Sequence, residues 1–301
     1  MRWSGSIRGV TISTENGVLD RVPAPVLFVL SGISMYVGAA LAVGLFEVAS
    51  PAGVAWLRCV GAALILLSWR RPGRAAWRGR PLLLAGTFGV VTAGMNVLFY
   101  EAIARLPLGT GVAIEFAGPV VVAALGSRGA RDIAALAGVV AGVLLIADVQ
   151  WEGSPAGVAY ALGAAAAWAA YIVLGKRVAL AGNGVDSLAV GFAVATVALS
   201  PLAVHTTAVW SEPGLLASAV GMGLLSTVVP YALDQVVLRR AGQARFALLL
   251  ALLPVTAAVI GFVVLGQVPA LVEALGILAV VAGVALGSGR TRAGRARGLR
   301  T

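Results

Sequence analysis

Ten runs of apolar residues, separated by short polar connections, make up most of this 301-residue chain. A helix needs about 20 predominantly apolar residues to cross the hydrocarbon core of a bilayer. The runs lie at residues 23–45, 51–69, 82–100, 107–126, 132–149, 155–175, 186–206, 214–237, 244–265 and 270–288. The connections leave no room for a soluble domain. The sequence therefore predicts an all-α, multi-pass membrane protein with ten transmembrane helices.

The composition excludes several other classes of protein. Apolar side chains make up 60% of the chain and charged ones only 11%, whereas soluble domains have roughly 45–50% and about 25%. Lipid is thus the expected partner of the surface, and the net charge of +10 indicates juxtamembrane arginines rather than nucleic-acid binding. The single cysteine, Cys59, and the single histidine, His205, exclude an intrachain disulfide and the usual zinc clusters. We expect no metal and no cofactor.

The first apolar run has features of a signal peptide, because arginines precede it and Ala40-Leu41-Ala42 resembles a cleavage site. The run, however, continues to Phe46, which is too long for a typical signal sequence. Its removal would also leave nine spans. We therefore favour a first transmembrane span.

The distribution of charge predicts the orientation. If the N-terminus lies in the cytoplasm, every Lys and Arg except Arg58 and Arg105 falls in a span end, loop or tail on the cytoplasmic side. The opposite side collects the acidic residues Glu47, Glu101, Asp148, Glu152, Glu212 and Glu273. Cytoplasmic loops are enriched in Lys and Arg. We therefore expect both termini in the cytoplasm, with residues 1–22 as an N-terminal segment and 289–301 as a basic tail.

The two halves of the chain resemble each other weakly. Residues 119–126 align with 254–261 after a shift of 135 residues, with Pro, Val, Ala and Gly coinciding, and both segments lie in the fourth span of a five-span half. Because five is odd, the second half must cross the membrane in the opposite sense. The sequence thus predicts two inverted repeats, 23–149 and 155–288, an architecture that many secondary transporters use.

Two five-helix halves with a proline in each fourth helix resemble the EamA domains of the drug/metabolite transporter superfamily. The run Phe99-Tyr100, Arg105-Leu-Pro-Leu-Gly109 and Gly111-Val-Ala-Ile-Glu-Phe-Ala-Gly-Pro119 is similar to the signature region of bacterial threonine/homoserine exporters. Further similar pieces are Gly38-Ala-Ala-Leu-Ala42, Ser50-Pro-Ala-Gly-Val54 and Ser226-Thr-Val-Val-Pro-Tyr-Ala-Leu-Asp234. The resemblance implies a non-enzymatic secondary transporter in the bacterial inner membrane that exports a small amino acid, and it is compatible with a homodimer.

Two departures from that group keep other functions open. The exporters have a glutamate just before the second-half proline, where this chain has Leu253, and a polar or basic residue near Val43. The loss of polar groups favours an alternative substrate, such as another apolar or cationic metabolite or drug. An alternative of another class is a membrane sensor or complex subunit that transports nothing and tolerates the loss of Glu115.

Glu115 is the strongest candidate for a binding residue. It lies in the middle of the fourth span, four residues before Pro119, and a proline removes the N–H that would pair with the carbonyl four residues earlier. The free carbonyl and the carboxylate of Glu115 therefore lie at one depth. A carboxyl in low dielectric favours binding a proton or an ammonium group, which are the requirements of proton antiport of an amine. The alternative is a structural carboxyl paired with a neighbouring helix.

Other polar residues in the spans have weaker claims. Arg58 could neutralise Glu115 or hold a substrate carboxylate, but the second helix is peripheral in the resembling fold, which favours a structural tether. Asp234 either faces a cytoplasmic entrance or pairs with arginines at the helix end. Pro119 and Pro254 are candidates for a structural or coupling role.

The resemblance also implies that the first, third, sixth and eighth helices line a central cavity. The uncharged side chains on these helices that could bind a small polar solute are Tyr36, Asn96, Tyr100, Trp168, Tyr171 and Tyr231. The amide of Asn96 stands out, because an unpaired amide is costly in the membrane. For the aromatic residues, packing against neighbouring helices or lipid is the alternative.

Overall fold

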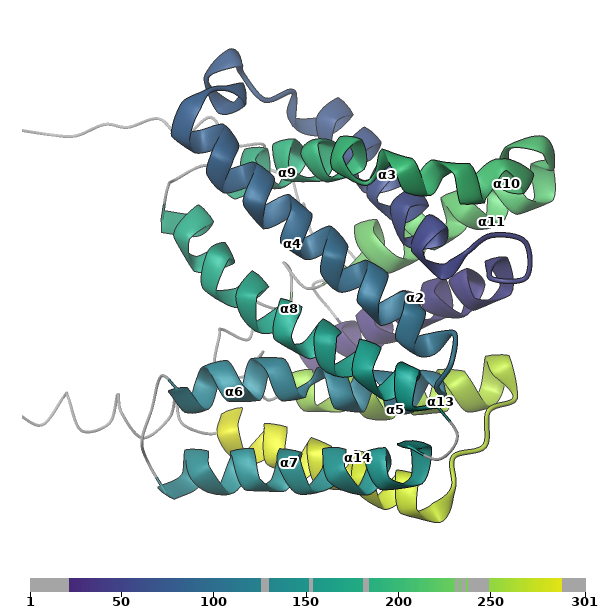
Figure 1. Cartoon of the computed structure of the whole chain (residues 1–301). Helices are drawn as coiled ribbons and strands as arrows, with labels where there is room; N and C mark the ends of the chain where they lie inside the picture. The colour runs from purple at the N-terminus through teal and green to yellow at the C-terminus, as the bar shows by residue number, and fades with distance from the viewer. Residues whose placement is uncertain are drawn as a thin grey trace, which may run out of the picture.

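The computed structural model describes residues 22–125, 130–151, 154–180, 184–230, 233, 237 and 249–288, and it contains no strand in these ranges. Figure 1 shows the helices as an elongated bundle. The α-helices are α2 (Ala24–Leu45), α3 (Pro51–Arg70), α4 (Gly79–Ile103), α5 (Leu108–Glu115), α6 (Ala117–Leu125), α7 (Ala130–Trp151), α8 (Pro155–Leu180), α9 (Gly184–Ala198), α10 (Thr207–Ser211), α11 (Pro213–Gly223), α13 (Leu253–Leu265) and α14 (Leu271–Ser288). Short 3-10 turns η1 (Arg74–Trp77), η2 (Ser200–Thr206) and η4 (Leu250–Leu252), and a π-helical turn η3 (Leu224–Val228), connect or extend them.

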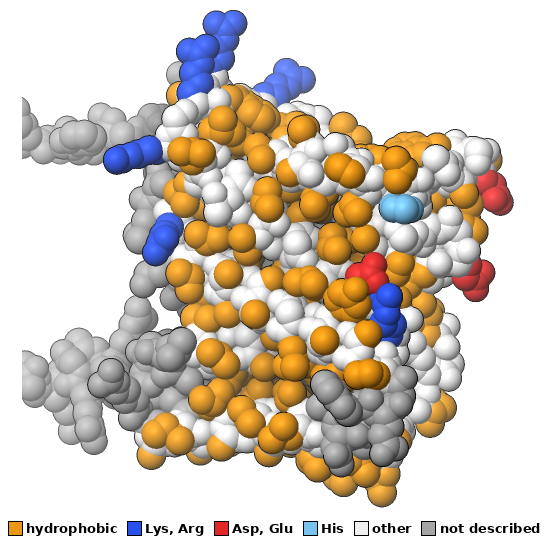
Figure 2. All heavy atoms as spheres, viewed as in Figure 1, with side chains coloured by type: hydrophobic (Ala, Val, Ile, Leu, Met, Phe, Trp, Pro, Cys, Tyr) orange, Lys and Arg blue, Asp and Glu red, His pale blue; other side chains and the backbone are white. Residues whose placement is uncertain are grey.

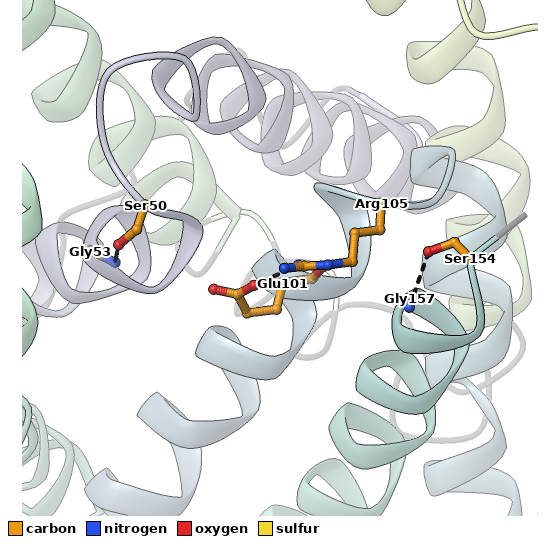
Figure 3. Close-up of polar contacts among 6 residues, drawn as sticks. All are labelled: Ser50, Gly53, Glu101, Arg105, Ser154 and Gly157. Atoms are coloured by element: carbon orange, nitrogen blue, oxygen red, sulfur yellow. Dashed lines mark hydrogen bonds and ion pairs between the residues drawn. The ribbon is translucent and has the colours of Figure 1, made fainter.

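Two helices begin with the same five residues, Ser-Pro-Ala-Gly-Val, at 50–54 and 154–158. In α3 the Ser50 hydroxyl accepts a hydrogen bond from the Gly53 N–H at 3.1 Å, and in α8 the Ser154 hydroxyl accepts one from the Gly157 N–H at 3.2 Å (Figure 3). These side chains pair backbone donors that a helix start leaves free, and the following proline fits the first turn.

Proline also accounts for the interruptions. The helix of the fourth predicted span stops at Glu115, one turn before Pro119, and resumes as α6 at Ala117. The seventh predicted span, 186–206, is bent by 67° between Asp186–Ala198 and Ser200–Ser211. Pro201 lies at this second break. The prediction of one continuous helix over 186–206 is therefore wrong. Pro201 has no N–H, so it cannot extend the backbone hydrogen bonds of α9.

Among the described residues, four helices are long and apolar enough to cross a membrane, or five if the bent pair counts as one span. These are α2, α3, α4, the segment Pro155–Gly175 of α8, and the bent pair. Shorter apolar helices lie in the other five predicted spans, at Leu108–Val122, Ile133–Ile146, Pro213–Thr227, Leu253–Leu265 and Leu271–Leu286, and only Pro213 precedes the start of its span, by one residue. The all-helical fold is confirmed, and the number of ten spans stays a prediction.

The surface fits a lipid environment. Large apolar side chains such as Leu83, Val197 and Leu271 are about seven-tenths exposed or more, and apolar side chains cover the middle of the face in Figure 2. Most Lys and Arg side chains in that view lie along the top and left edges, whereas the Asp and Glu side chains lie towards the right, one of them beside a further Lys or Arg side chain. An apolar band between basic and acidic ends is typical of a membrane-embedded protein.

Small residues set the closest helix contacts. Helices α7 and α14 pack side by side (Figure 1), and a Cβ added to Gly142 of α7 would lie 2.6 Å from the Gly276 carbonyl oxygen of α14. Helix α4 crosses α9 in the same way, with Gly89 against the backbone of Gly191. In lipid, packing of small residues replaces the hydrophobic effect as the force between helices.

We predict that Gly89→Ala destabilises the protein, because even a methyl group at this position overlaps the Gly191 carbonyl of α9. Overpacking of this kind costs roughly 1–3 kcal/mol, and thermal unfolding of the purified protein in detergent measures it. Gly94→Ala on the same helix is the matched control, since no atom of the described residues lies within 4 Å of its added Cβ. Equal melting temperatures of the two variants would contradict the close α4–α9 crossing.

Candidate functional site

Glu115 is buried at the end of α5, with only 8% of its surface exposed. Its position follows from the break before Pro119, which turns the chain at Phe116 and places the carboxyl at the junction of α5 and α6. Two side chains from other helices interact electrostatically with this carboxyl, the Arg58 guanidinium of α3 and the Tyr36 hydroxyl of α2. The structure thus brings together residues that lie far apart in the sequence.

Arg58 extends from α3 into the same region. Its Nη2 donates a hydrogen bond to the Ser226 carbonyl oxygen at 3.1 Å, and its guanidinium carbon lies 5.9 Å from the centre of the Tyr100 ring. Tyr100 is fully buried, and its hydroxyl has no hydrogen-bond partner among the residues that the structure describes. Five residues from five different elements make up this region, which we call the central cluster. They are Tyr36 of α2, Arg58 of α3, Tyr100 of α4, Glu115 of α5 and Ser226 of η3.

A half-buried cation, a buried carboxyl and a buried hydroxyl without a hydrogen-bond partner in the described part of the chain are complementary to a small zwitterion. An unpaired buried hydroxyl is costly unless a ligand or water satisfies it, and a guanidinium binds carboxylates well. The arrangement can therefore bind an ammonium group at Glu115 and a carboxylate at Arg58.

Ser226 was missed by the sequence analysis. It lies in η3, whose backbone contacts α2 so closely that a Cβ on Gly38 would lie 2.8 Å from the Ser226 nitrogen. The Ser34 hydroxyl of α2 donates to the Leu225 carbonyl at 2.9 Å. The signal was present, because Pro230 lies four residues after Ser226 and the rule applied to Pro119 and Glu115 applies here as well.

The other predicted side chains differ in their surroundings. Asn96 is buried one turn before Tyr100, and its Nδ2 donates to the Thr92 carbonyl at 3.0 Å. One N–H of the amide is therefore paired within its own helix. Trp168 of α8 packs edge-on against Phe116, with ring centres 4.9 Å apart, and so lies beside the turn that follows Glu115.

Tyr171 does not join the central cluster. Its ring stacks on Phe88, with centres 4.9 Å apart, and Phe88 precedes Tyr100 by about 18 Å along α4. Tyr231 and Asp234 lie outside the described residues.

The departure at Leu253 has a structural counterpart. Leu253 and Pro254 are buried at the start of α13, and the Leu253 side chain lies 3.2 Å from where a Cβ on Gly32 would be. An apolar side chain thus fills the crossing of α13 with α2.

Glu273 is a second buried carboxyl, which the sequence analysis counted only among the acidic residues of the outer side. It is 3% exposed and accepts hydrogen bonds from the Thr110 hydroxyl at 2.9 Å and the Ala270 N–H at 2.8 Å. Nearby, the Gln267 side-chain oxygen accepts a hydrogen bond from the Leu108 N–H at 2.8 Å. These bonds join the start of α5 to the connection between α13 and α14, so Glu273 fits a structural role.

The acidic residue at the end of α4 also has a local partner. Glu101 pairs with Arg105 one turn later (Figure 3), and the Arg105 guanidinium lies 5.0 Å from the centre of the Tyr160 ring of α8. This pair anchors the end of α4 to α8.

Comparison with known proteins identifies the family. The sequence profile of the EamA-like transporter family matches residues 155–288. The threonine/homoserine exporter RhtA of Salmonella typhimurium strain LT2 is 34% identical over 264 residues, which cover 86% of this chain and 89% of the relative. RhtA of Escherichia coli K12 is 33% identical over 274 residues, covering 88% and 92%.

A solved structure has the same fold. A crystal structure with 21% sequence identity superimposes with a TM-score of 0.58 and covers 92% of this chain and 99% of its own. The predicted resemblance to this group of transporters is confirmed by relatives that match over most of the chain. The chain belongs to the EamA-like transporter family.

Proposed function

We propose that this protein is a secondary transporter that exports threonine, homoserine or a similar small amino acid across the bacterial inner membrane in exchange for protons. The observation that carries the proposal is the burial of Glu115 within electrostatic reach of Arg58. The relatives that are named threonine/homoserine exporters support the choice of substrate.

Each charged group of an amino acid has a counterpart in the central cluster. Glu115 binds the ammonium group, and Arg58 binds the α-carboxylate. The Tyr100 hydroxyl, which has no hydrogen-bond partner in the described part of the chain, can form a hydrogen bond with a polar substrate side chain. Because a hydrogen-bonding site leaves polar groups unpaired when the wrong solute enters, it discriminates strongly against analogues that lack one of these groups.

Proton exchange follows from the surroundings of Glu115. Burial in low dielectric makes the charged form of the Glu115 carboxyl costly even with Arg58 within electrostatic reach, and a bound ammonium or a bound proton offsets this cost. When the substrate ammonium leaves, a proton takes its place, and when the substrate binds, the proton leaves. A single carboxyl that holds one or the other, but not both, links export to proton entry.

The helix contacts support two inverted repeats, 23–149 and 155–288. If the halves are related by a pseudo-two-fold axis, each contact between them has a counterpart. In such a repeat α2 is equivalent to α8, α3 to α9, and α4 to α11 with η3. The contact of α4 with α8 then corresponds to the contact of α2 with α11 and η3. The contact of α4 with α9 likewise corresponds to the contact of α3 with α11. The contacts of α5 and α6 with α8 correspond to that of α2 with α13. Rocking of such repeats against each other gives alternating access.

An exporter of an apolar or cationic compound is the second candidate. The buried Leu253 side chain at the α2–α13 crossing favours it, since a glutamate is the residue of the threonine/homoserine exporters at that position. Such a substrate has no carboxylate for Arg58, and this difference separates the two candidates experimentally.

For the orientation, we predict that both termini lie in the cytoplasm. With Cys59 replaced, a cysteine at Arg74 of η1 is then shielded from an impermeant thiol reagent in intact cells, whereas one at Glu212 is labelled. Both residues are exposed, so access to the reagent depends on the side of the membrane. Labelling of Arg74→Cys from outside would contradict this orientation.

For the coupling, we predict that Glu115→Gln inserts normally but loses proton-driven export. The amide keeps the shape of the carboxyl but can neither carry the charge that binds an ammonium nor release a proton. Flux driven by a pH gradient in proteoliposomes measures the effect, with Glu101→Gln in the surface ion pair as the control. A rate and pH dependence equal to those of the wild type would leave Glu115 a structural carboxyl.

For the substrate, we predict that Arg58→Gln raises the KM for threonine about tenfold or more, since a hydrogen bond to a charged group contributes roughly 1.5–3 kcal/mol. Threoninamide, which has the amine but no carboxylate, should be transported by the variant and the wild type with similar KM. An unchanged preference for threonine over threoninamide would exclude Arg58 as the carboxylate ligand and favour the second candidate.

A further inference from the structure

Pro230 lies two residues after the end of the π-helical turn η3 and changes the hydrogen bonding of two carbonyl groups. In this turn the Val229 N–H bonds to the Leu224 carbonyl, five residues earlier. The next N–H along the chain would pair with the Leu225 carbonyl in the π register or with the Ser226 carbonyl in the α register. Proline has no N–H, so residue 230 supplies a helical donor to neither carbonyl.

Both carbonyls accept hydrogen bonds from the first half of the protein instead. The Ser34 hydroxyl of α2 donates to the Leu225 carbonyl at 2.9 Å, and the Arg58 Nη2 of α3 donates to the Ser226 carbonyl at 3.1 Å. A carbonyl without a partner is costly in a membrane. Because Pro230 offers no N–H to the Ser226 carbonyl, this carbonyl is a stronger acceptor for the Arg58 guanidinium.

The position of the Arg58 guanidinium depends on that acceptor. Arginine has a long side chain with many rotamers, and its planar group binds a carboxylate well only when it is oriented. The Ser226 carbonyl holds one nitrogen, while the Tyr100 ring lies 5.9 Å from the guanidinium carbon. The remaining N–H groups of the guanidinium can then donate to a ligand beside Glu115.

We infer that Pro230 is a positioning residue for Arg58, and that the carbonyl it leaves free at Ser226 determines the preference for solutes with an α-carboxylate. The inference rests on the proposed function and deepens it. In the α register, a residue with an N–H at position 230 pairs with the Ser226 carbonyl within the helix. Arg58 then loses its fixed acceptor, and the carboxylate meets a guanidinium that is spread over several rotamers.

The test measures Pro230→Ala in proteoliposomes with threonine and threoninamide. We expect the KM for threonine to rise about tenfold, as for the loss of one charge-assisted hydrogen bond, with the maximal rate and the KM for threoninamide close to those of the wild type. A variant with a merely looser helix would affect both solutes alike. Pro213→Ala is the matched control, because this exposed proline begins α11, where a missing N–H has no helical acceptor.

Pro230→Ser provides a second variant if Pro230→Ala does not insert. Serine supplies both an N–H and a hydroxyl that can bond to the carbonyl one turn earlier, so it competes with Arg58 for the Ser226 carbonyl. We expect the same selective rise in the KM for threonine. An unchanged ratio of the two KM values in a variant that inserts would overturn the role of Pro230.

The double variant Arg58→Gln/Pro230→Ala separates this inference from the proposed function. If Pro230 acts through Arg58, Pro230→Ala changes the ratio of the KM values for threonine and threoninamide no further when Arg58 is absent. A further change of the ratio would show an independent role of Pro230 and overturn the inference. If Arg58→Gln alone leaves the preference for threonine intact, the proposed carboxylate site is wrong, and the role of Pro230 in substrate preference is wrong with it.

Discussion

A backbone carbonyl inside a membrane must find a donor within the protein, because lipid offers none. The central cluster depends on this constraint at two places. Pro119 removes the donor for the Glu115 carbonyl and ends α5, and Pro230 removes the α-helical donor for the Ser226 carbonyl in η3. At the second place the replacement donor is the Arg58 guanidinium. Proline thus brings a charged side chain from another helix into the interior of the protein.

The lipid environment also explains why glycine lies at the closest contacts between helices. Lipid tails are as apolar as leucine, so burial of large apolar side chains gives little net attraction between helices. Contacts such as Gly142 with Gly276 and Gly89 with Gly191 let backbones approach and bring many atoms into van der Waals contact. Many leucine and valine side chains, such as Leu83 and Val197, can then lie exposed on the outside, where contact with lipid is favourable.

The positions of the helices could be predicted from the sequence because the thickness of the bilayer fixes their length. The predicted span 23–45 is the helix Ala24–Leu45, and 51–69 is Pro51–Arg70. The end of α5 at Glu115 follows from Pro119 by a local rule. The number of spans, the orientation in the membrane and the inverted repeats stay predictions. They depend on the apolar runs, on the distribution of charge and on the pattern of helix contacts, respectively.

The partners of the polar residues could not be predicted, because they depend on which helices meet. The Arg58–Ser226 bond joins residues 168 positions apart, and no spacing in the sequence indicates it. Asn96, by contrast, pairs with Thr92 in its own helix, although its buried amide had suggested a binding group. A polar residue in a span is therefore interpreted better from its partners than from its depth.

The two buried carboxyls illustrate this difference. Glu273 accepts hydrogen bonds from a hydroxyl and a backbone N–H at the start of α14, so its charge is already stabilised, and removing these bonds to bind a solute would cost free energy. Glu115 instead lies at a break between two helices, within electrostatic reach of a guanidinium that is held by another group. A ligand with both an ammonium and a carboxylate can satisfy Glu115 and Arg58 together without breaking a helix-capping bond. Of the two carboxyls, Glu115 is thus the one whose surroundings are suited to exchange between a proton and a substrate.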